Sequence, residues 1–355
     1  GRAVAQSGSA LRWGCRGRQF KSDRPDHFSF PPSFLARLLS GAVLFSDEVK
    51  LARVALFVLF AGMTAKKIGW IGTGVMGASM AGHLLQAGHE VAVHTRTKEK
   101  AADLLERGAT WRDSPAEAAE GADFTFAIVG YPADVVETFL GERGVLRTAR
   151  RGSVVADMTT SEPALAERIA EEAAKTGVAA LDAPVSGGDL GARNATLAIM
   201  AGGEREAYER TLPLFEVMGK KVALFGPAGS GQRVKMSNQI LIASTMIGTV
   251  ESLLYAARSG LDPEAVIELI GSGAAGCWSI NNLGPRIVKG DFAPGFFIKH
   301  FVKDMGIALQ DAEPMNLNLP GLALAKEFYD KAVEAGMEND GTQGLYKLFE
   351  SLAES

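Results

Sequence analysis

Lys67–Ile71 (Lys-Ile-Gly-Trp-Ile) runs directly into Gly72-Thr73-Gly74-Val75-Met76-Gly77. The first five residues are short and apolar, which favours a strand, and the amphipathic pattern from Val75 to Gln86 predicts a helix. The glycines therefore match the G-x-G-x-x-G fingerprint in its strand–turn–helix context. Gly72 allows the tight turn, Gly74 lets a pyrophosphate approach the backbone, and Gly77 lets the helix pack on the strand. We predict a dinucleotide site at Gly72, Thr73, Gly74, Val75, Met76 and Gly77, with the helix N-terminus facing the phosphates.

The second predicted strand, Glu90–His94, decides which dinucleotide is expected. Sites for NAD usually carry an acidic residue at the end of this strand, where it binds the ribose hydroxyls. Here the strand is followed by Thr95, Arg96 and Thr97. A guanidinium can bind a 2′-phosphate, so the sequence favours NADP and leaves NAD as the alternative.

Strands continue to alternate with helices up to about residue 226. Predicted strands are Ala122–Val129, Ser153–Asp157, Val178–Asp182 and Thr196–Ala201, and predicted helices are Pro132–Leu140 and Glu162–Thr176. This alternation is typical of a mainly parallel, doubly wound sheet. Ligands of such sheets bind at the carboxyl ends of the strands.

The second half of the chain predicts helices only. Gly229–Ser259 lacks proline and reads as one long helix, and its middle, Gln239–Val250, is apolar enough to be buried on all sides. Further helices are expected after the Asp262 cap, over Ile298–Asp311 and over Leu322–Ala335. We therefore predict an α/β Rossmann-type domain over residues 63–226 and an all-α domain over residues 227–355, joined by the long helix.

Residues 1–62 differ from the remainder in charge and composition. They hold nine Lys or Arg against four Asp or Glu, a net charge of +5, whereas the remainder carries −9. They contain no Met, and all 11 Met lie from Met63 onward. We expect an extension outside the fold, and a cytoplasmic protein. An organelle transit peptide is the alternative, because the segment is rich in Arg and Ser.

Composition excludes several classes of protein. A net charge of −4 over 355 residues disfavours a nucleic-acid-binding protein. Two cysteines, Cys15 and Cys277, exclude a disulfide scaffold, and we expect no metal site. No uncharged apolar run reaches the roughly 18 residues of a membrane-spanning helix, so we expect no membrane partner.

Four motifs in order resemble those of the β-hydroxyacid dehydrogenases. They are the glycine fingerprint, Asp182-Ala183-Pro184-Val185-Ser186-Gly187-Gly188, Gly229-Ser230-Gly231-Gln232-Arg233-Val234-Lys235, and Lys303-Asp304. The resemblance covers about Lys66 to Leu352, and the C-terminal half resembles that of 6-phosphogluconate dehydrogenase. It implies hydride transfer between NAD(P) and a small β-hydroxy acid, its semialdehyde or keto acid, in a homo-oligomer of two or four chains.

The resemblance makes Lys235 the catalytic general acid or base. This role is chemically sound, because burial on an apolar helix lowers the pKa of a lysine towards neutrality. The same resemblance implies that the substrate carboxylate is bound by Ser186, Gly187 and Gly188, and that Asn238 and Gln239 orient the substrate or the lysine. The family usually has a second Asn in place of Gln239.

Cofactor contacts are carried over in the same way. Thr160 is expected near the nicotinamide ribose, and Lys303 is expected to reach the cofactor. Val129 and Gly130 are expected on the adenosine side, where the family often has a Leu-Pro pair. Two alternatives remain at this point: an enzyme of the 6-phosphogluconate or imine reductase type, or a non-catalytic cofactor-binding module on the same fold. Lys235 disfavours the non-catalytic module.

Overall fold

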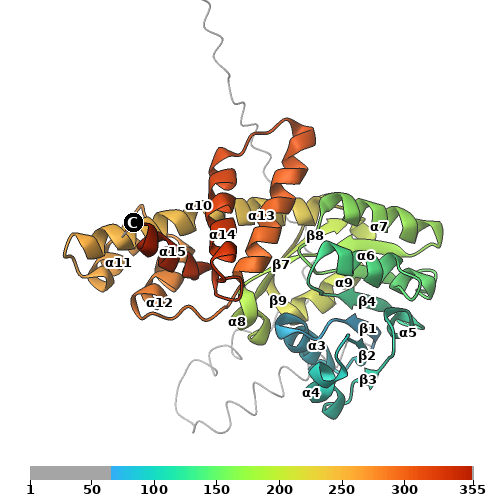
Figure 1. The fold of residues 1–355 in the computed structure, drawn as a ribbon. Coiled ribbons are helices and arrows are strands. Elements are labelled where there is room, and N and C mark those ends of the chain that lie inside the picture. The colour runs from blue at the N-terminus through green and yellow to red at the C-terminus, as the bar shows by residue number, and fades with distance from the viewer. Residues whose placement is uncertain (1–64, 354–355) are drawn as a thin grey trace, which may run out of the picture. The chain divides into compact units, whose positions relative to one another are not determined.

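The computed structural model describes residues 65–353, so the predicted extension over residues 1–62 lies outside the described residues. The described part belongs to one compact unit, Phe60–Ser355. It consists of a sheet lobe, from β1 to β9, and a helical lobe, from α11 to α15, with the long helix α10 shared by both (Figure 1).

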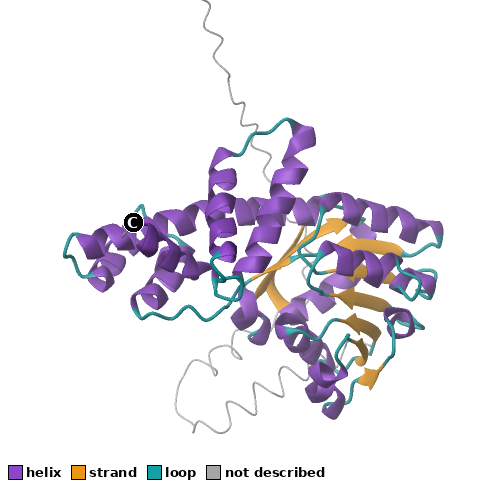
Figure 2. Ribbon diagram, viewed as in Figure 1, coloured by secondary structure: helices purple, strands orange, loops and turns teal. Residues whose placement is uncertain are grey.

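Six parallel strands form the main part of the sheet, in the order β3-β2-β1-β4-β5-β6. This order is that of the Rossmann fold, in which ligands bind outside the carboxyl ends of the strands, at the point between β1 and β4 where the strand order reverses. Helices connect the successive strands and flank the sheet (Figure 2). The strands are β1 Lys67–Ile71, β2 Glu90–His94, β3 Thr110–Trp111, β4 Phe124–Ala127, β5 Val154–Asp157 and β6 Ala179–Asp182. The helices are α3 Val75–Gln86, α4 Ala102–Glu106, α5 Pro115–Ala119, α6 Pro132–Leu140 and α7 Pro163–Lys175.

Beyond β6 the sheet changes direction, which the sequence did not predict in detail. β8 (Leu197–Gly203) pairs antiparallel with β6 and with the short β7 (Val185–Ser186). β9 (Gly219–Leu224) then pairs parallel with β8, after a crossover through α9 (Arg205–Met218). The short helix α8 (Gly188–Arg193) follows β7.

The core lies on both faces of the sheet because neighbouring strand residues point to opposite faces. Trp70 is fully buried on one face, where its ring lies 5.7 Å from that of Phe126, which in turn lies 6.0 Å from Phe215. Ile71, the next residue, packs on the other face with Phe139. A parallel sheet buried on both faces needs nearly continuous apolar strands, and this is what β1, β4 and β5 have.

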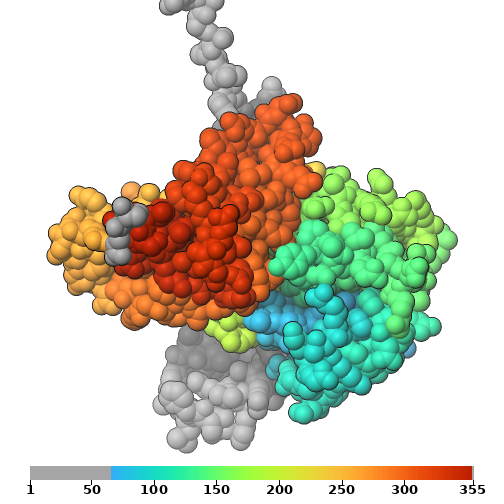
Figure 3. Space-filling model, in the orientation of Figure 1, coloured from blue at the N-terminus to red at the C-terminus, as the bar shows by residue number. Residues whose placement is uncertain are grey.

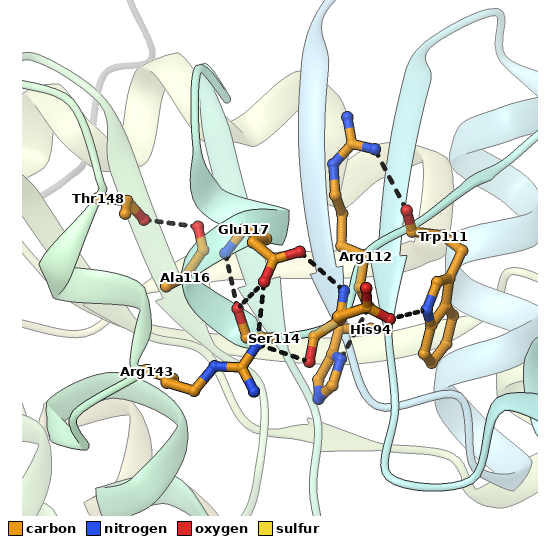
Figure 4. Close-up of polar contacts among 9 residues, drawn as sticks. His94, Trp111, Arg112, Ser114, Ala116, Glu117, Arg143 and Thr148 are labelled. Carbon is orange, nitrogen blue, oxygen red and sulfur yellow. Dashed lines mark hydrogen bonds and ion pairs between the residues drawn. The ribbon is translucent and has the colours of Figure 1, made fainter.

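Side-chain hydrogen bonds fix the loops near β2 and β3, at one edge of the sheet (Figure 4). His94 Nδ1 donates to the carbonyl of Arg112 at 3.0 Å, so the end of β2 is tied to the residue after β3. Ser114 caps α5 by accepting from Glu117 N, and Glu117 accepts from Arg143 Nη2 at 2.9 Å. The His94 contact holds the backbone that leads into Thr95 and Arg96.

The helical lobe packs around α10 (Ser230–Arg258), in agreement with the predicted long helix. α13, α14 and α15 lie against it, and the rings of Phe301 and Tyr329 meet at 5.0 Å in the lobe's core. The predicted cap is also present, since the Asp262 carboxylate accepts from Glu264 N. The other helices are α11 Pro263–Gly271, α12 Gly284–Val288, α13 Ile298–Ala312, α14 Pro320–Glu334 and α15 Leu345–Leu352, with a π-helical turn at Ser279–Leu283.

One prediction for α10 was wrong. Gln239–Val250 is not buried on all sides, because Leu241 is 66% exposed and Gly248 is exposed on the same side of the helix. The physical reason is that the neighbouring helices pack against the other side of α10. By length and composition, α10 is also the one helix within residues 65–353 that could cross a membrane. It packs against α13, α14 and β8, and 33% of its most apolar stretch is buried.

The start of α10 is held by a carboxylate from the sheet. Asp182, the last residue of β6, accepts from Gly229 N and from Gln232 N, both at 2.8 Å. The first N–H groups of a helix have no partner within the helix, so a carboxylate there satisfies them and is favoured by the helix dipole. This buried contact joins the sheet lobe to the helix that carries Lys235.

We expect Asp182→Ala to lower the free energy of unfolding by about 3 kcal/mol or more, because each buried N–H left unpaired costs roughly 1–3 kcal/mol. The matched control is Asp262→Ala, which removes an exposed cap and should cost only about 0.5–2 kcal/mol. Urea unfolding followed by circular dichroism measures both. Equal costs for the two variants would contradict a special role for Asp182.

Candidate active site

The glycine turn lies where the sequence placed it, between β1 and α3. Gly72 has φ +94°, a conformation that favours glycine, and its N–H donates to the carbonyl of His94 at 2.9 Å. A Cβ built on Gly72 would lie 2.1 Å from the Ile128 carbonyl oxygen, and one on Gly77 would lie 2.0 Å from the Gly72 carbonyl oxygen. Both glycines are therefore required by close packing of the turn against β4 and α3.

The other residues of the turn leave room and polar groups for a ligand. A Cβ on Gly74 would meet nothing within 4 Å, and Val75, the first residue of α3, is exposed. Met76 packs partly buried against the core. The Thr73 hydroxyl is buried without a hydrogen-bond partner among the described residues. An open backbone, an unpaired hydroxyl and a helix N-terminus fit the pyrophosphate of a dinucleotide.

The residues after β2 are exposed and carry one contact that the sequence could not show. Arg96 Nη1 lies 3.0 Å from Asp134 Oδ1 on α6, and the Arg96 side chain is 83% exposed. Thr95 is half-buried and Thr97 is exposed. The acidic residue typical of NAD sites is absent from the end of β2, but the carboxylate of Asp134 on α6 lies close to Arg96. Arg96 keeps its other nitrogen atoms free of protein partners among residues 65–353.

Loops after β4 and β5 meet at the same edge of the sheet. Val129 N donates to Thr159 Oγ1 at 3.0 Å, which joins the two loops. Gly130 follows Val129, and a Cβ on it would lie 3.1 Å from Asp134 Oδ2. Lys303, on α13 of the helical lobe, donates from Nζ to the carbonyl of Thr160 at 2.5 Å. The two lobes are thus bonded at the residue predicted to lie by the nicotinamide ribose.

Lys235 lies in the second turn of α10, with only 7% of its surface exposed. Burial lowers the pKa of its ammonium to about 8, against the opposing effect of the Asp304 carboxylate and with a further lowering by Lys303. Within residues 65–353 the Lys235 side chain makes no hydrogen bond or ion pair. A buried lysine whose pKa lies near neutral pH, and whose N–H groups have no hydrogen-bond partner within residues 65–353, suits proton transfer.

A chain of polar side chains continues from Lys303 to the residues after Lys235. Lys303 Nζ lies 3.0 Å from Asp304 Oδ1, and Asp304 Oδ2 accepts from Gln239 Nε2 at 2.7 Å. Gln239 Oε1 in turn accepts from Asn238 Nδ2 at 2.8 Å. The side chain of Gln239, where the family usually has Asn, is therefore bonded to α13.

The predicted substrate loop is a tight turn between β7 and α8. Gly187 and Gly188 have φ +133° and +63°, and Ser186 is half-buried. A Cβ on Gly188 would lie 3.7 Å from the Gly295 carbonyl oxygen, so the helical lobe approaches this turn. Figure 3 shows the blue surface at the start of the described chain beside the orange and red surface of that lobe.

Several buried polar residues of the site were not assigned a role from the sequence. Among them, Asp157 and Asp182 end β5 and β6, and Gln232 lies in the first turn of α10. Burial raises the pKa of Asp157 to about 7, although Thr159 N donates to its carboxyl at 3.0 Å. Their position in the sequence could have identified the two carboxyls as site residues. Asp157 and Asp182 each end a buried parallel strand, at the carboxyl ends where ligands of such sheets bind.

Comparison with known families agrees with this geometry. Residues 67–226 match the family described as the NAD binding domain of 6-phosphogluconate dehydrogenase, and residues 229–349 match the NAD-binding domain of NADP-dependent 3-hydroxyisobutyrate dehydrogenase. A probable 3-hydroxyisobutyrate dehydrogenase-like 1, mitochondrial, of Arabidopsis thaliana is 52% identical over 81% of this chain and 86% of its own. The chain belongs to the β-hydroxyacid dehydrogenase family.

Two further relatives extend the match. YkwC of Bacillus subtilis (strain 168), an uncharacterized oxidoreductase, is 55% identical over 80% of this chain and 99% of its own. The structure of a 3-hydroxyisobutyrate dehydrogenase from Mycobacterium tuberculosis with L-serine superposes with a TM-score of 0.74. That protein is 28% identical, and the match covers 81% of this chain and 99% of the other. Members of this family are NAD(P)-dependent oxidoreductases of small hydroxy acids, and this enzyme is one of them.

Two glycines of the turn separate packing from cofactor binding. We expect Gly77→Ala to lower the thermal midpoint, because its Cβ would overlap the Gly72 carbonyl oxygen, and overpacking typically costs about 1–3 kcal/mol. Gly74→Ala should keep the midpoint, since its Cβ meets no atom, yet weaken binding of the nicotinamide dinucleotide. Calorimetry and a fluorescence titration with the dinucleotide make the two measurements. A Gly74→Ala protein with unchanged dinucleotide affinity would contradict the placement of the pyrophosphate.

Proposed function

We propose that the enzyme reduces a small carboxylate-bearing semialdehyde or keto acid to its β-hydroxy acid, with Lys235 as the general acid and NADPH preferred to NADH. The observation that carries the proposal is the buried Lys235 ammonium, whose pKa burial lowers to about 8. It lies on the helix whose first turn is bonded to the ligand edge of the sheet.

The proton and the hydride have separate sources in this proposal. Bound nicotinamide supplies the hydride in reduction and accepts it in oxidation. Lys235 Nζ donates a proton to the carbonyl oxygen as it becomes a hydroxyl, and in oxidation the neutral amine removes that proton. Asn238 and Gln239 orient the substrate beside Lys235, and the Gln239 amide is held in place by Asp304.

The substrate carboxylate is assigned to the turn at Ser186, Gly187 and Gly188. Successive N–H groups in a glycine turn can converge on an anion. The Mycobacterium tuberculosis relative is described with L-serine, which is itself a β-hydroxy carboxylic acid. A rate screen of glyoxylate and of succinic, methylmalonic and tartronic semialdehydes, with each nicotinamide cofactor, tests the substrate class.

The cofactor contacts follow from the edge of the sheet described above. The pyrophosphate is assigned to Gly72–Gly77, and the adenosine ribose phosphate to Thr95, Arg96 and Thr97. Val129 and Gly130 lie on the adenosine side, and Thr160 and Lys303 on the nicotinamide side. Asp134 orients the Arg96 guanidinium, while the remaining N–H groups of Arg96 face solvent and can reach a phosphate.

Three broader assignments complete the proposal. The nucleotide domain spans residues 63–226 and the substrate domain residues 227–355. The enzyme acts in the cytoplasm as a homo-oligomer of two or four chains, which light scattering after size exclusion tests. Exposed Leu241 and Tyr255 on α10 support an association of this kind.

Lys235→Met keeps the apolar contacts of the side chain and removes the proton donor. We expect kcat for reduction to fall by about 10²–10⁴-fold, the usual contribution of general acid–base catalysis, with cofactor affinity nearly unchanged. Lys331→Met, on an exposed lysine paired with Glu327, is the control and should keep wild-type turnover. Steady-state rates and a cofactor titration measure both, and near-normal turnover of the Lys235 variant would overturn the assignment.

The pH dependence has opposite signs in the two directions. Reduction needs the Lys235 ammonium, so its kcat/KM should hold below pH about 8 and fall above it. Oxidation needs the neutral amine, so its kcat/KM should rise through the same pH. Profiles in both directions from one preparation would reveal a shared apparent pKa, which the Lys235→Met variant should lack.

Arg96 decides the cofactor preference in this proposal. One charge-assisted hydrogen bond contributes about 1.5–3 kcal/mol, which corresponds to roughly a 10- to 100-fold preference for NADPH in kcat/KM. Arg96→Ala should remove most of it and leave kinetics with NADH unchanged. Arg205→Ala, another exposed arginine of the sheet lobe, is the control. The role of Arg96 is excluded if the wild type uses both cofactors equally well.

A further inference from the structure

Gln232 is fully buried in the first turn of α10 and uses both ends of its side-chain amide on one loop. Its Nε2 donates to the carbonyl of Thr159 at 2.8 Å, and its Oε1 accepts from Ser161 N at 3.0 Å. The backbone N–H of Gln232 is bonded separately, to Asp182. One residue therefore fixes the helix start and the loop together.

The amide has only one orientation that satisfies these partners. A backbone N–H can only donate and a backbone carbonyl can only accept, so Oε1 must face Ser161 and Nε2 must face Thr159. Glutamine carries both a donor and an acceptor on the same planar group. A side chain that is apolar, or that can only donate or only accept, cannot replace it. Residues 158–162 have no regular secondary structure, so such side-chain bonds define their path.

Thr160 lies between the two residues that Gln232 holds. Its carbonyl accepts from Lys303, and the proposed function places it beside the nicotinamide ribose. Lys235 is three residues after Gln232 on the same helix, so a fixed length of α10 separates the amide from the proton donor. Asp157 and Val129 hold Thr159 only from the sheet side.

We propose that Gln232 is a positioning residue, which aligns the Thr159–Ser161 loop with Lys235 through its amide and so sets the distance between nicotinamide and proton donor. This inference rests on the proposed function. Gln232 touches neither the substrate nor the cofactor in this assignment. Its loss should therefore lower kcat more than it raises KM for the substrate.

The test replaces the amide with a group whose donor can be switched by pH. In Gln232→Glu the ionised carboxylate still accepts from Ser161 N but has no hydrogen for the Thr159 carbonyl, whereas the protonated acid restores that donor. We expect kcat about 10- to 100-fold below wild type at pH 8, since misplacement by about 1 Å can cost that much. The ratio of variant to wild-type kcat should rise several-fold as pH falls to about 6.

Other charged groups around this position are shared with the wild type. They are the carboxyls of Asp157 and Asp182 and the ammonium groups of Lys303 and Lys235. Because the readout is a ratio at each pH, their own titration largely cancels. Gln232→Met provides a variant of similar size that cannot titrate, and it should show a low ratio at every pH.

Gln343→Glu is the matched control for burying a carboxyl. Gln343 is equally buried, and its Nε2 donates to the carbonyls of Asp291 and Ala293, far along the chain from the nicotinamide loop. It should lower the thermal midpoint without changing the shape of the pH profile. A Gln232→Glu ratio that is flat with pH, or wild-type kcat in Gln232→Met, would overturn the positioning role.

Failure of the proposed function gives a different result. If Lys235→Met keeps normal turnover, the proton donor is misassigned whatever the Gln232 variants do. If Lys235→Met is inactive and the Gln232 variants lose only thermal stability, the proposed function stands and the positioning role fails. Rates with one semialdehyde substrate of the wild type are sufficient for both comparisons.

Discussion

The carboxylate of Asp182 at the start of α10 is the contact on which the arrangement of the site depends. A helix start needs acceptors for its free N–H groups, and a buried one cannot take them from water. Asp182 supplies them from the end of β6, next to the loop that continues to Ser186. The helix that carries Lys235 is therefore located by the same strand that leads to the proposed carboxylate turn.

Buried charge is distributed over the site so that each ionisable group is tuned by its neighbours. Burial lowers the pKa of Lys235 to about 8. Lys303 instead forms an ion pair with Asp304 and donates a hydrogen bond to the Thr160 carbonyl. Asp157 is buried so completely that its pKa rises to about 7. Two lysines that lie near each other thus have different tasks: one holds the loop between the lobes, and the other remains free of protein partners within residues 65–353.

Much of this could be predicted from local pattern, and the remainder depended on contacts between distant residues. Lys235 was singled out by the resemblance to the β-hydroxyacid dehydrogenases, whereas the glycine turn and the long helix follow from spacing and hydrophobicity within short segments. The antiparallel β8 and the Arg96–Asp134 pair do not, because each joins parts of the chain whose proximity only the folded sheet creates. The exposed side of α10 was missed for a related reason. An apolar segment shows that some surface is buried, but not which helices cover it.

The sharing of α10 between the two lobes has a consequence for how the enzyme unfolds. Its first turns belong to the hydrogen-bonded edge of the sheet, and its later turns form the centre of the helical core. An α-helix loses its backbone bonds cooperatively, so neither lobe can melt without disturbing the support of the other. The two lobes should then behave as one thermodynamic unit, with equal calorimetric and van't Hoff enthalpies, although a chain of this length would usually unfold domain by domain.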